Sequence, residues 1–262
     1  MLRLLVGAAA LGLLIGSAEA APASHPSQVS ASSGELVLRG TISVRSDAAS
    51  CPADAPEADY CFTRTGSGVI PGLGTVSATY AFLVDKSCPE DGDLLLPSKG
   101  RLIVTGKGEI DVSLSGLPDC FVPASLVLKA KESFTVTGGT GKYVGASGSG
   151  TVQHDIAQAA GGPGPGHDLW VGTLAVPGLD FDVTAPVFKG AVAKSIRVPA
   201  GKKTARVSYV VTARDQVDGV VPVTCRPPSG TLIRIGRTSV TCSATDKSGN
   251  VASVKFTVLV KR

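Results

Sequence analysis

The sequence predicts an all-β protein with two domains. The chain contains 32 Gly and 17 Pro among its 262 residues, with many Val and Thr, a composition typical of strands joined by tight turns. After residue 20, no stretch keeps the 3.6-residue periodicity of an amphipathic helix. The 242 residues that remain suit two domains of about 100 to 150 residues each.

The first 20 residues have the three parts of a secretory signal peptide. Arg3 makes a basic start, residues 4–15 form an apolar run, and Ala18-Glu-Ala20 is a small-residue cleavage site. The apolar run is shorter than the ~20 residues of a transmembrane helix, and no later segment is long and apolar enough to span a bilayer. We expect residues 1–20 to be removed, residues 21–32 to be a disordered leader, and the mature chain to be secreted, where six cysteines can pair.

The first domain is expected over residues 33–180. Eight runs within it have the composition or alternation of strands and are separated by Gly-rich turns. The runs are residues 35–44, 75–84, 100–104, 110–114, 125–129, 134–137, 148–154 and 169–174. Eight strands of this kind predict a closed barrel or a sandwich.

A Gly-rich stretch lies near the end of this domain. Residues 134–143 read Phe-Thr-Val-Thr-Gly-Gly-Thr-Gly-Lys-Tyr, and residues 145–150 read Gly-Ala-Ser-Gly-Ser-Gly. Val136 and Tyr143 stand where a phosphate-binding P-loop needs Gly and Ser or Thr, and the later glycines lack the dinucleotide-binding spacing. We interpret the glycines as sharp turns and close approaches to a neighbouring strand. The stretch resembles the core motif of allene-oxide-cyclase-like and dirigent-like barrels, which implies a barrel fold but transfers no catalytic residue.

Four cysteines, Cys51, Cys61, Cys88 and Cys120, fall in loops or strand ends of the first domain. Their spacing is not that of the paired C-x-x-C motifs of zinc sites, so disulfides are the expected use. The preferred pairing is Cys51 with Cys61 and Cys88 with Cys120. Four cysteines allow three connectivities, and the sequence does not decide among them.

Residues with catalytic chemistry are scattered. His25 lies in the leader, while His154 and His167 are each followed by an aspartate, Asp155 and Asp168. Neighbours in a strand point to opposite faces, so neither His154 with Asp155 nor His167 with Asp168 is expected to form an acid–base pair. We expect these four residues to be surface side chains. No Gly-x-Ser-x-Gly motif of a hydrolase is present. The sequence predicts no catalytic residue, no cofactor and no enzyme activity.

Two acidic groups have the oxygen ligands that Ca²⁺ prefers. They are the run Glu90-Asp91-Gly-Asp93 and the pair Asp215 with Asp218. Neither matches the spacing of a known calcium loop, and Asp is common in turns of extracellular proteins. We therefore predict turns and no metal site.

The last forty residues have a clear strand pattern. Residues 221–225 and 240–244 alternate so that Cys225 and Cys242 share a face with the apolar side chains. The sequence Asp-Lys-Ser-Gly-Asn at 246–250 predicts a hairpin turn, and residues 254–260 alternate as a final strand. An upstream strand is expected at residues 206–212.

These strands, cysteines and turn, over about residues 183–261, resemble one hyalin-repeat (HYR) domain. The resemblance implies an extracellular immunoglobulin-like sandwich with an internal disulfide, Cys225–Cys242, and a role in adhesion and not in chemistry. A further cysteine pair, found in many animal repeats of the family, is absent. The expected fold is therefore an N-terminal β-barrel-like domain, a linker at 181–186 and a C-terminal immunoglobulin-like β-sandwich at 187–262.

The charge is divided between these domains. Residues 183–262 carry 14 Lys or Arg and 3 Asp or Glu, a net charge of +11, whereas residues 21–182 carry 10 and 17, a net charge of −7. This division fits either ordinary solvated surfaces that attract each other or a polyanion-binding C-terminal domain. The candidate polyanion-binding residues are Lys189, Lys194, Arg197, Lys202, Lys203, Arg206, Arg226, Arg234, Arg237 and Lys255.

The expected partner is an anionic cell-wall polymer or polysaccharide, or another extracellular protein. Nucleic acid is not expected, because no aromatic platform accompanies the basic residues. A single Met and a single Asn beside abundant Ala, Gly and Val are typical of a GC-rich bacterial genome. The sequence thus predicts a secreted bacterial protein with a non-catalytic binding or adhesive role. The alternative is small hydrophobic ligand binding or isomerase activity inside the barrel, which a large polar cavity would favour and an interior of Val, Leu and Phe would oppose.

Overall fold

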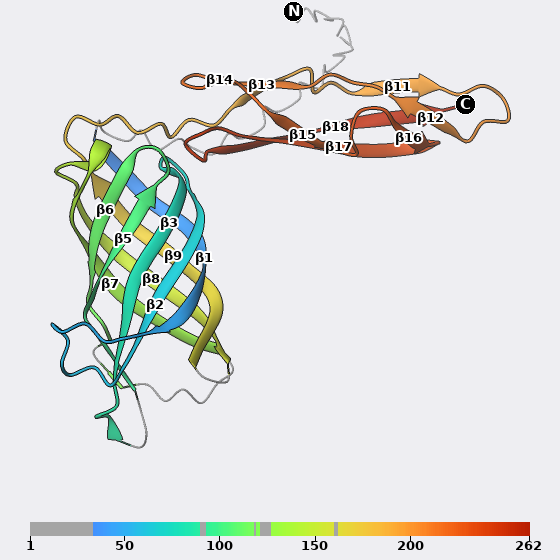
Figure 1. The fold of residues 1–262 in the computed structure, drawn as a ribbon. Coiled ribbons are helices and arrows are strands. Elements are labelled where there is room, and N and C mark those ends of the chain that lie inside the picture. The colour runs from blue at the N-terminus through green and yellow to red at the C-terminus, as the bar shows by residue number, and fades with distance from the viewer. Residues whose placement is uncertain (1–33, 90–92, 118, 121–126, 160–161) are drawn as a thin grey trace, which may run out of the picture. The chain divides into compact units, whose positions relative to one another are not determined.

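The computed structural model describes residues 34–89, 93–117, 119–120, 127–159 and 162–262 (Figure 1). The predicted signal peptide and leader, His25, and residues 90–92 of the acidic run lie outside these ranges. The described residues are almost entirely strands and turns, with a short 3₁₀ helix, η2, at Gly141–Tyr143. They contain no helix that could cross a membrane. The predicted all-β class is confirmed.

The N-terminal domain is an antiparallel barrel of eight strands. Its sheet has the order β2-β1-β9-β8-β7-β6-β5-β3 and closes through the pairing of β2 with β3. A further short strand, β4, pairs with the end of β3. The strands are β1 (Glu35–Ala49), β2 (Tyr60–Ile70), β3 (Gly74–Asp85), β4 (Leu94–Leu96), β5 (Ser98–Val104), β6 (Gly108–Leu114), β7 (Val127–Gly139), β8 (Ser147–Ala159) and β9 (Gly162–Ala175).

The predicted number of barrel strands is correct, but two predictions about them were wrong. Strand β2 was missed, because its inward positions hold Arg64, Gly66 and Gly68 where an apolar alternation was sought. Strand β7 was predicted as two strands separated at residues 130–133. It runs through because Lys131 points to solvent while the buried Glu132 points inward. Charged residues in these strands hide the period of two on which the prediction depends.

Large apolar side chains fill much of the barrel interior. The rings of Phe134 and Trp170 are 5.1 Å apart and both residues are fully buried. Phe134 lies against Gly150, where an added Cβ would come within 2.8 Å of the ring and 2.2 Å of the Val171 carbonyl oxygen. The Gly-rich stretch therefore allows close approach to neighbouring chain, as its composition predicts.

Both predicted disulfides of the first domain are present. Cys51 pairs with Cys61, which fastens the loop between β1 and β2 to the start of β2. Cys88 pairs with Cys120 across a sequence separation of 32. All six cysteines of the chain are thus paired, including Cys225 with Cys242 in the second domain. Such pairing fits an oxidising, extracellular environment.

The C-terminal domain is built from three small sheets. One has the order β11-β18-β17-β15, a second β10-β13-β14, and the third pairs β12 with β16. The strands are β10 (Val187–Lys189), β11 (Lys194–Arg197), β12 (Thr204–Val207), β13 (Thr212–Asp215), β14 (Gly219–Val221), β15 (Val223–Arg226), β16 (Thr231–Arg234), β17 (Gly236–Thr245) and β18 (Val251–Lys261).

The core of this domain lies between the sheets, as in a β-sandwich. Val240 and Val258 of the four-stranded sheet pack with Val207 and Ile233 of the β12–β16 pair. Cys225 and Cys242 are direct partners in the register of β15 and β17, and their disulfide adjoins this core. The predicted turn at 246–250 does join β17 and β18.

The prediction of one strand over residues 206–212 was wrong in detail. Strand β12 ends at Val207, and β13 begins only at Thr212. Tyr209 between them is nevertheless buried, and its ring lies 5.1 Å from that of Phe256. The alternation therefore identified the inward side chains correctly, although the backbone between the two strands belongs to no sheet.

Candidate functional site

One face of the C-terminal domain carries a group of cations. The outward positions of β11, β18, β17 and β15 include Arg197, Lys255, Lys261, Arg237 and Arg226, which we call the basic sheet face. All five residues are exposed. They share a face because strand residues alternate between core and solvent, and the core positions are taken by side chains of the sandwich interior.

The register places these cations on neighbouring strands. Arg226 is opposite Thr241 of β17, and Thr241 is opposite Lys255 of β18. Arg197 is opposite Lys261 in the parallel pairing of β11 with β18. Residues directly opposite one another have Cβ atoms about 4.5–5.5 Å apart in an antiparallel pair, so Arg226 and Lys255 are separated by a single intervening residue.

Between the cations the face carries hydroxyl groups. Its outward positions include eight Ser or Thr residues, with Val251 and Leu259 as the apolar members, and none of these strand positions is Asp or Glu. The Ser and Thr residues are Ser195, Thr224, Ser239, Thr241, Ser243, Thr245, Ser253 and Thr257. The face therefore offers positive charge and hydrogen-bond donors without a carboxylate on the same four strands to neutralise it.

Four of the ten predicted polyanion-binding residues, Arg197, Arg226, Arg237 and Lys255, belong to this face. Two others are bonded within the domain, since Lys194 Nζ donates to the Ser208 carbonyl at 2.8 Å and Arg206 Nη1 to the Gly230 carbonyl at 2.8 Å. The remaining four lie on other strands or turns, and they are Lys189, Lys202, Lys203 and Arg234. The prediction also missed Lys261, although the alternation of the last strand places it on the outward side.

The barrel interior contains a second group of functional side chains. Arg64, Tyr80, Glu132, His154 and Asp168 are all at least 96 % buried, and we call them the interior polar network. They come from five strands, β2, β3, β7, β8 and β9. Inward alternation on each strand and the closure of the barrel bring them together.

Asp168 is the centre of this network. Its carboxylate accepts from Arg64 Nη2 at 2.9 Å and Nε at 3.2 Å, and the Tyr80 hydroxyl also donates to it. His154 Nδ1 lies 2.9 Å from Asp168 Oδ1, and His154 Nε2 lies 2.8 Å from Glu132 Oε1. With His154 protonated, both ring nitrogens donate, and two cations balance two anions.

The contacts shift the pKa values of the network. Burial acts to lower the pKa of His154, but hydrogen bonds and the negative charges of Asp168 and Glu132 raise it above its ordinary value. Burial acts to raise the pKa of Asp168, but hydrogen bonds from His154 and Arg64 bring it below its ordinary value. Burial, followed by the charge of Asp168, raises the pKa of Tyr80 well above 10.0. The shifts favour a protonated His154, an ionised Asp168 and a neutral Tyr80, which are the states that these hydrogen bonds require.

The expectation that His154 and Asp168 are surface side chains was wrong. Both are fully buried, and they pair with each other across β8 and β9, whereas His167 is exposed. The argument that sequence neighbours point apart was sound, but the partner of His154 is 14 residues away. Arg64 and Asp168 are separated by 104 residues, and only barrel closure brings them together.

The second domain is thus a β-sandwich with one internal disulfide, Cys225–Cys242. The family model of the HYR domain matches residues 181–260, which confirms the resemblance seen in the sequence. The match begins six residues before the predicted start of the domain at 187. No curated protein and no solved structure shows significant similarity to the chain.

Proposed function

We propose that the protein is a secreted, non-catalytic binding protein whose HYR domain attaches to anionic polymers at a cell surface or in an extracellular matrix. The basic sheet face carries this proposal. It presents Arg197, Arg226, Arg237, Lys255 and Lys261 on adjacent strands, with hydroxyl groups between them. HYR domains are an extracellular, adhesion-like family, which supports the same role.

The physical basis of binding is electrostatic complementarity. Arg side chains form bidentate hydrogen bonds with carboxylate, sulfate or phosphate groups, and a flat sheet gives a row of such contacts to an extended chain. Hydroxyl groups add hydrogen bonds to sugar oxygens. Exposed charge pairs are individually weak, at about 0.2–1 kcal/mol, so the affinity depends on several pairs acting together. Binding should therefore fall as salt rises and the Debye length shortens from ~10 Å at 0.1 M to ~3 Å at 1 M.

The test compares two triple variants of the secreted chain on immobilised heparin and polygalacturonate, with neutral dextran as the uncharged polymer. One variant carries Arg226→Ser, Arg237→Ser and Lys255→Ser on the basic sheet face. The matched variant carries Lys189→Ser, Lys202→Ser and Lys203→Ser, exposed positions away from that face. The first should weaken binding about tenfold at 0.1 M salt, and the second less than threefold.

Equal losses in both variants would mean that only net charge matters, and the basic sheet face would then have no special role. Retention on dextran equal to that on heparin would exclude an electrostatic mechanism. Failure of the wild-type chain to bind either polyanion would overturn the proposal for this chemical class of partner.

A second candidate is binding of a small molecule, or isomerase activity, inside the barrel. The interior polar network favours it, because a buried ion pair is often no more stable than well-packed apolar residues of the same volume. His154 and Tyr80 have the chemistry of acid–base groups. The test is titration with a panel of hydrophobic ligands, followed by the fluorescence of Trp170, the single tryptophan. A saturable change that His154→Gln abolishes would support this candidate, and a flat response across the panel would oppose it.

A further inference from the structure

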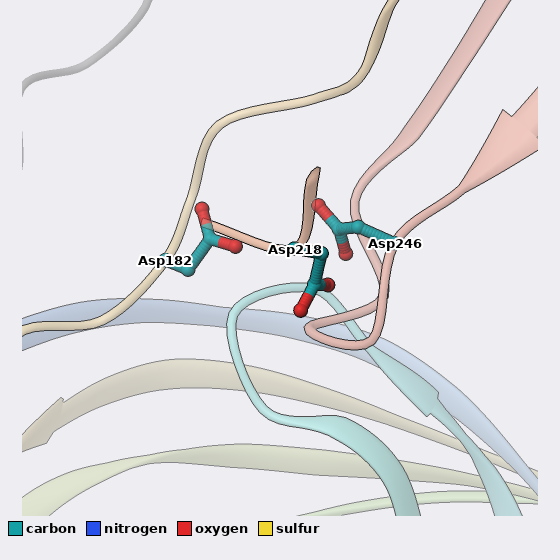
Figure 2. A group of neighbouring side chains, drawn as sticks. All are labelled: Asp182, Asp218 and Asp246. Atoms are coloured by element: carbon teal, nitrogen blue, oxygen red, sulfur yellow. The ribbon is translucent and has the colours of Figure 1, made fainter. Parts of the chain in front are cut away.

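The C-terminal domain contains an acidic cluster that the proposed function does not use. Asp182, Asp218 and Asp246 each place one carboxylate oxygen within 4.8 Å of the others (Figure 2). They come from three separate segments. Asp182 lies at the start of the matched HYR region, Asp218 in the turn between β13 and β14, and Asp246 in the turn between β17 and β18.

Hydrogen bonds hold these carboxylates in place. Asp218 Oδ2 accepts from the Lys247 amide at 2.7 Å. Asp246 accepts from the amide and the side chain of Asn250 at 2.8 and 2.9 Å. The Asn250 side chain also donates to the Asp182 carbonyl at 2.9 Å, so it connects two of the three segments. The acidic groups are therefore fixed by the fold and do not meet by chance at a mobile surface.

A fourth aspartate, Asp215, is an independent indication of a ligand. It is 98 % buried, and its Oδ1 accepts from the amides of Val217 and Asp218 at 2.7 and 2.9 Å. Its Oδ2 is buried without a hydrogen-bond partner. A buried oxygen of this kind is costly unless something else satisfies it.

Strand alternation shows where Asp215 points. Ala213, two residues earlier on the same inward side of β13, packs in one cluster with Ala244 of β17. Asp246 lies two residues beyond Ala244. The Lys247 amide donates to Asp218, so the segment after Ala213 and the segment after Ala244 run toward the same end of the domain. Asp215 therefore points to the acidic cluster. Asp182 Oδ2 is a second buried oxygen without a partner.

The charges of the cluster are only partly compensated. The charge of Lys107 acts on Asp218, Asp182 and Asp246, but its Nζ donates to the Leu73 carbonyl at 2.8 Å. Lys247 Nζ lies 3.5 Å from Asp218 Oδ1, but the lysine side chain is 84 % exposed and screened by water. Carboxylates gathered in this way repel one another unless a cation lies between them.

We propose that Asp182, Asp218 and Asp246 bind one Ca²⁺ ion, and that Asp215 completes the site through a bridging water. Ligands that are all oxygen select a hard cation over zinc or copper. Calcium–oxygen distances of about 2.3–2.6 Å allow two ligands on opposite sides of one ion to be about 4.6–5.2 Å apart, which fits the spacing of the three oxygens. Water-bridged carboxylates are common in calcium sites, and the smaller Mg²⁺ demands tighter octahedral geometry.

Bound Ca²⁺ would connect three segments that are also joined by hydrogen bonds and by the Lys247–Asp218 ion pair. These are the chain entering the domain at Asp182, the β13–β14 turn and the β17–β18 turn. The ion would neutralise the repulsion among the carboxylates and stabilise this end of the sandwich. This role is separate from the basic sheet face, so either proposal can fail without the other.

The experiment is calorimetric titration of the secreted chain, freed of metal, with CaCl₂ and separately with MgCl₂. Extracellular calcium modules have dissociation constants of about 10⁻⁴–10⁻³ M, and we expect Ca²⁺ to bind once in that range. At ~10 mM Ca²⁺ the melting temperature of the C-terminal domain should rise by about 5–10 °C. Hydrogen exchange of residues 216–219 and 246–250 should slow at the same time.

The matched variants are Asp218→Asn, within the cluster, and Asp180→Asn, an exposed aspartate that is not one of the four. Asp218→Asn should weaken Ca²⁺ binding at least tenfold, whereas Asp180→Asn should bind as wild type does. Absence of a calorimetric response in the wild-type chain would overturn the proposal. So would wild-type affinity in Asp218→Asn, or an equal response to Mg²⁺, which would indicate nonspecific attraction of divalent cations.

Discussion

The two domains both bury ionisable groups, but they compensate these groups in opposite ways. In the barrel, Arg64 and protonated His154 balance Asp168 and Glu132, and the four side chains bond to one another. In the C-terminal domain, the buried or half-buried aspartates at 182, 215, 218 and 246 form no ion pair with a buried cation among the described residues, and the lysine paired with Asp218, Lys247, is exposed. The first arrangement needs nothing from outside the chain. The second is incomplete until a cation joins it.

The largest expected effect comes from breaking the barrel network. Arg64→Met should lower the free energy of unfolding by about 3–5 kcal/mol, because Asp168 would stay buried without its bidentate partner. Urea unfolding followed by the fluorescence of Trp170 measures the loss. Arg101→Met, which removes the ion pairs of the exposed Arg101 with Glu109 and Asp111, should cost less than about 1 kcal/mol.

The double variant Arg64→Met with Asp168→Leu sharpens this test. It removes both charges, so it should recover a substantial part of the loss in Arg64→Met. If the double variant were no more stable than the single one, the loss would reflect packing and not an uncompensated carboxylate.

The second-largest expected loss of stability comes from removing the disulfide of the C-terminal domain. Replacing Cys225 and Cys242 by Ala releases a loop with a sequence separation of 17, which should cost about 3 kcal/mol. Calorimetry should show a lower transition temperature for this domain while Trp170, in the barrel, reports an unchanged one. A shift in the Trp170 signal would contradict independent stabilisation of the two domains.

A smaller effect should appear with pH. The pKa of His154 is raised in the folded barrel, so its contribution to stability is complete below about 6.5 and is lost as pH rises through the folded value. The pKa of Asp168 is lowered, so its contribution is complete above about 3.9 and is lost as pH falls through the folded value. Barrel stability should therefore decline on the alkaline side, and His154→Gln should remove that decline. A wild-type barrel of constant stability from pH 6 to pH 10 would contradict a protonated His154.

The smallest effect distinguishes the acidic cluster of the C-terminal domain from the buried Asp168 of the barrel. In buffer without divalent cations, Asp218→Asn should change the free energy of unfolding by no more than about 0.5 kcal/mol, because relief of repulsion offsets the weaker acceptor for the Lys247 amide. Asp168→Asn should be strongly destabilising in the same buffer. A large loss in Asp218→Asn without metal would show that the acidic cluster is self-sufficient, which would contradict the comparison between the domains.

Local patterns determined much of this protein from the sequence alone. Alternation of apolar residues identified the last strands and the inward direction of Cys225 and Cys242, and the sequence Asp-Lys-Ser-Gly-Asn identified the turn at 246–250. Glycine placement indicated the close packing near Gly150. These features are readable because the physical cause, burial of one face or freedom from a side chain, acts on residues close together in the chain.

Tertiary structure decided the interior polar network and the assembly of the acidic cluster. Strand β2 was missed because Arg64 occupies an inward position, and that position is tolerable only with Asp168 on a strand 104 residues later. Asp182, Asp218 and Asp246 likewise meet through the folding of three separate segments. A buried charge interrupts the apolar alternation of its strand and is stabilised by a distant partner. Its position therefore follows from barrel closure and strand register, which no short stretch of sequence contains.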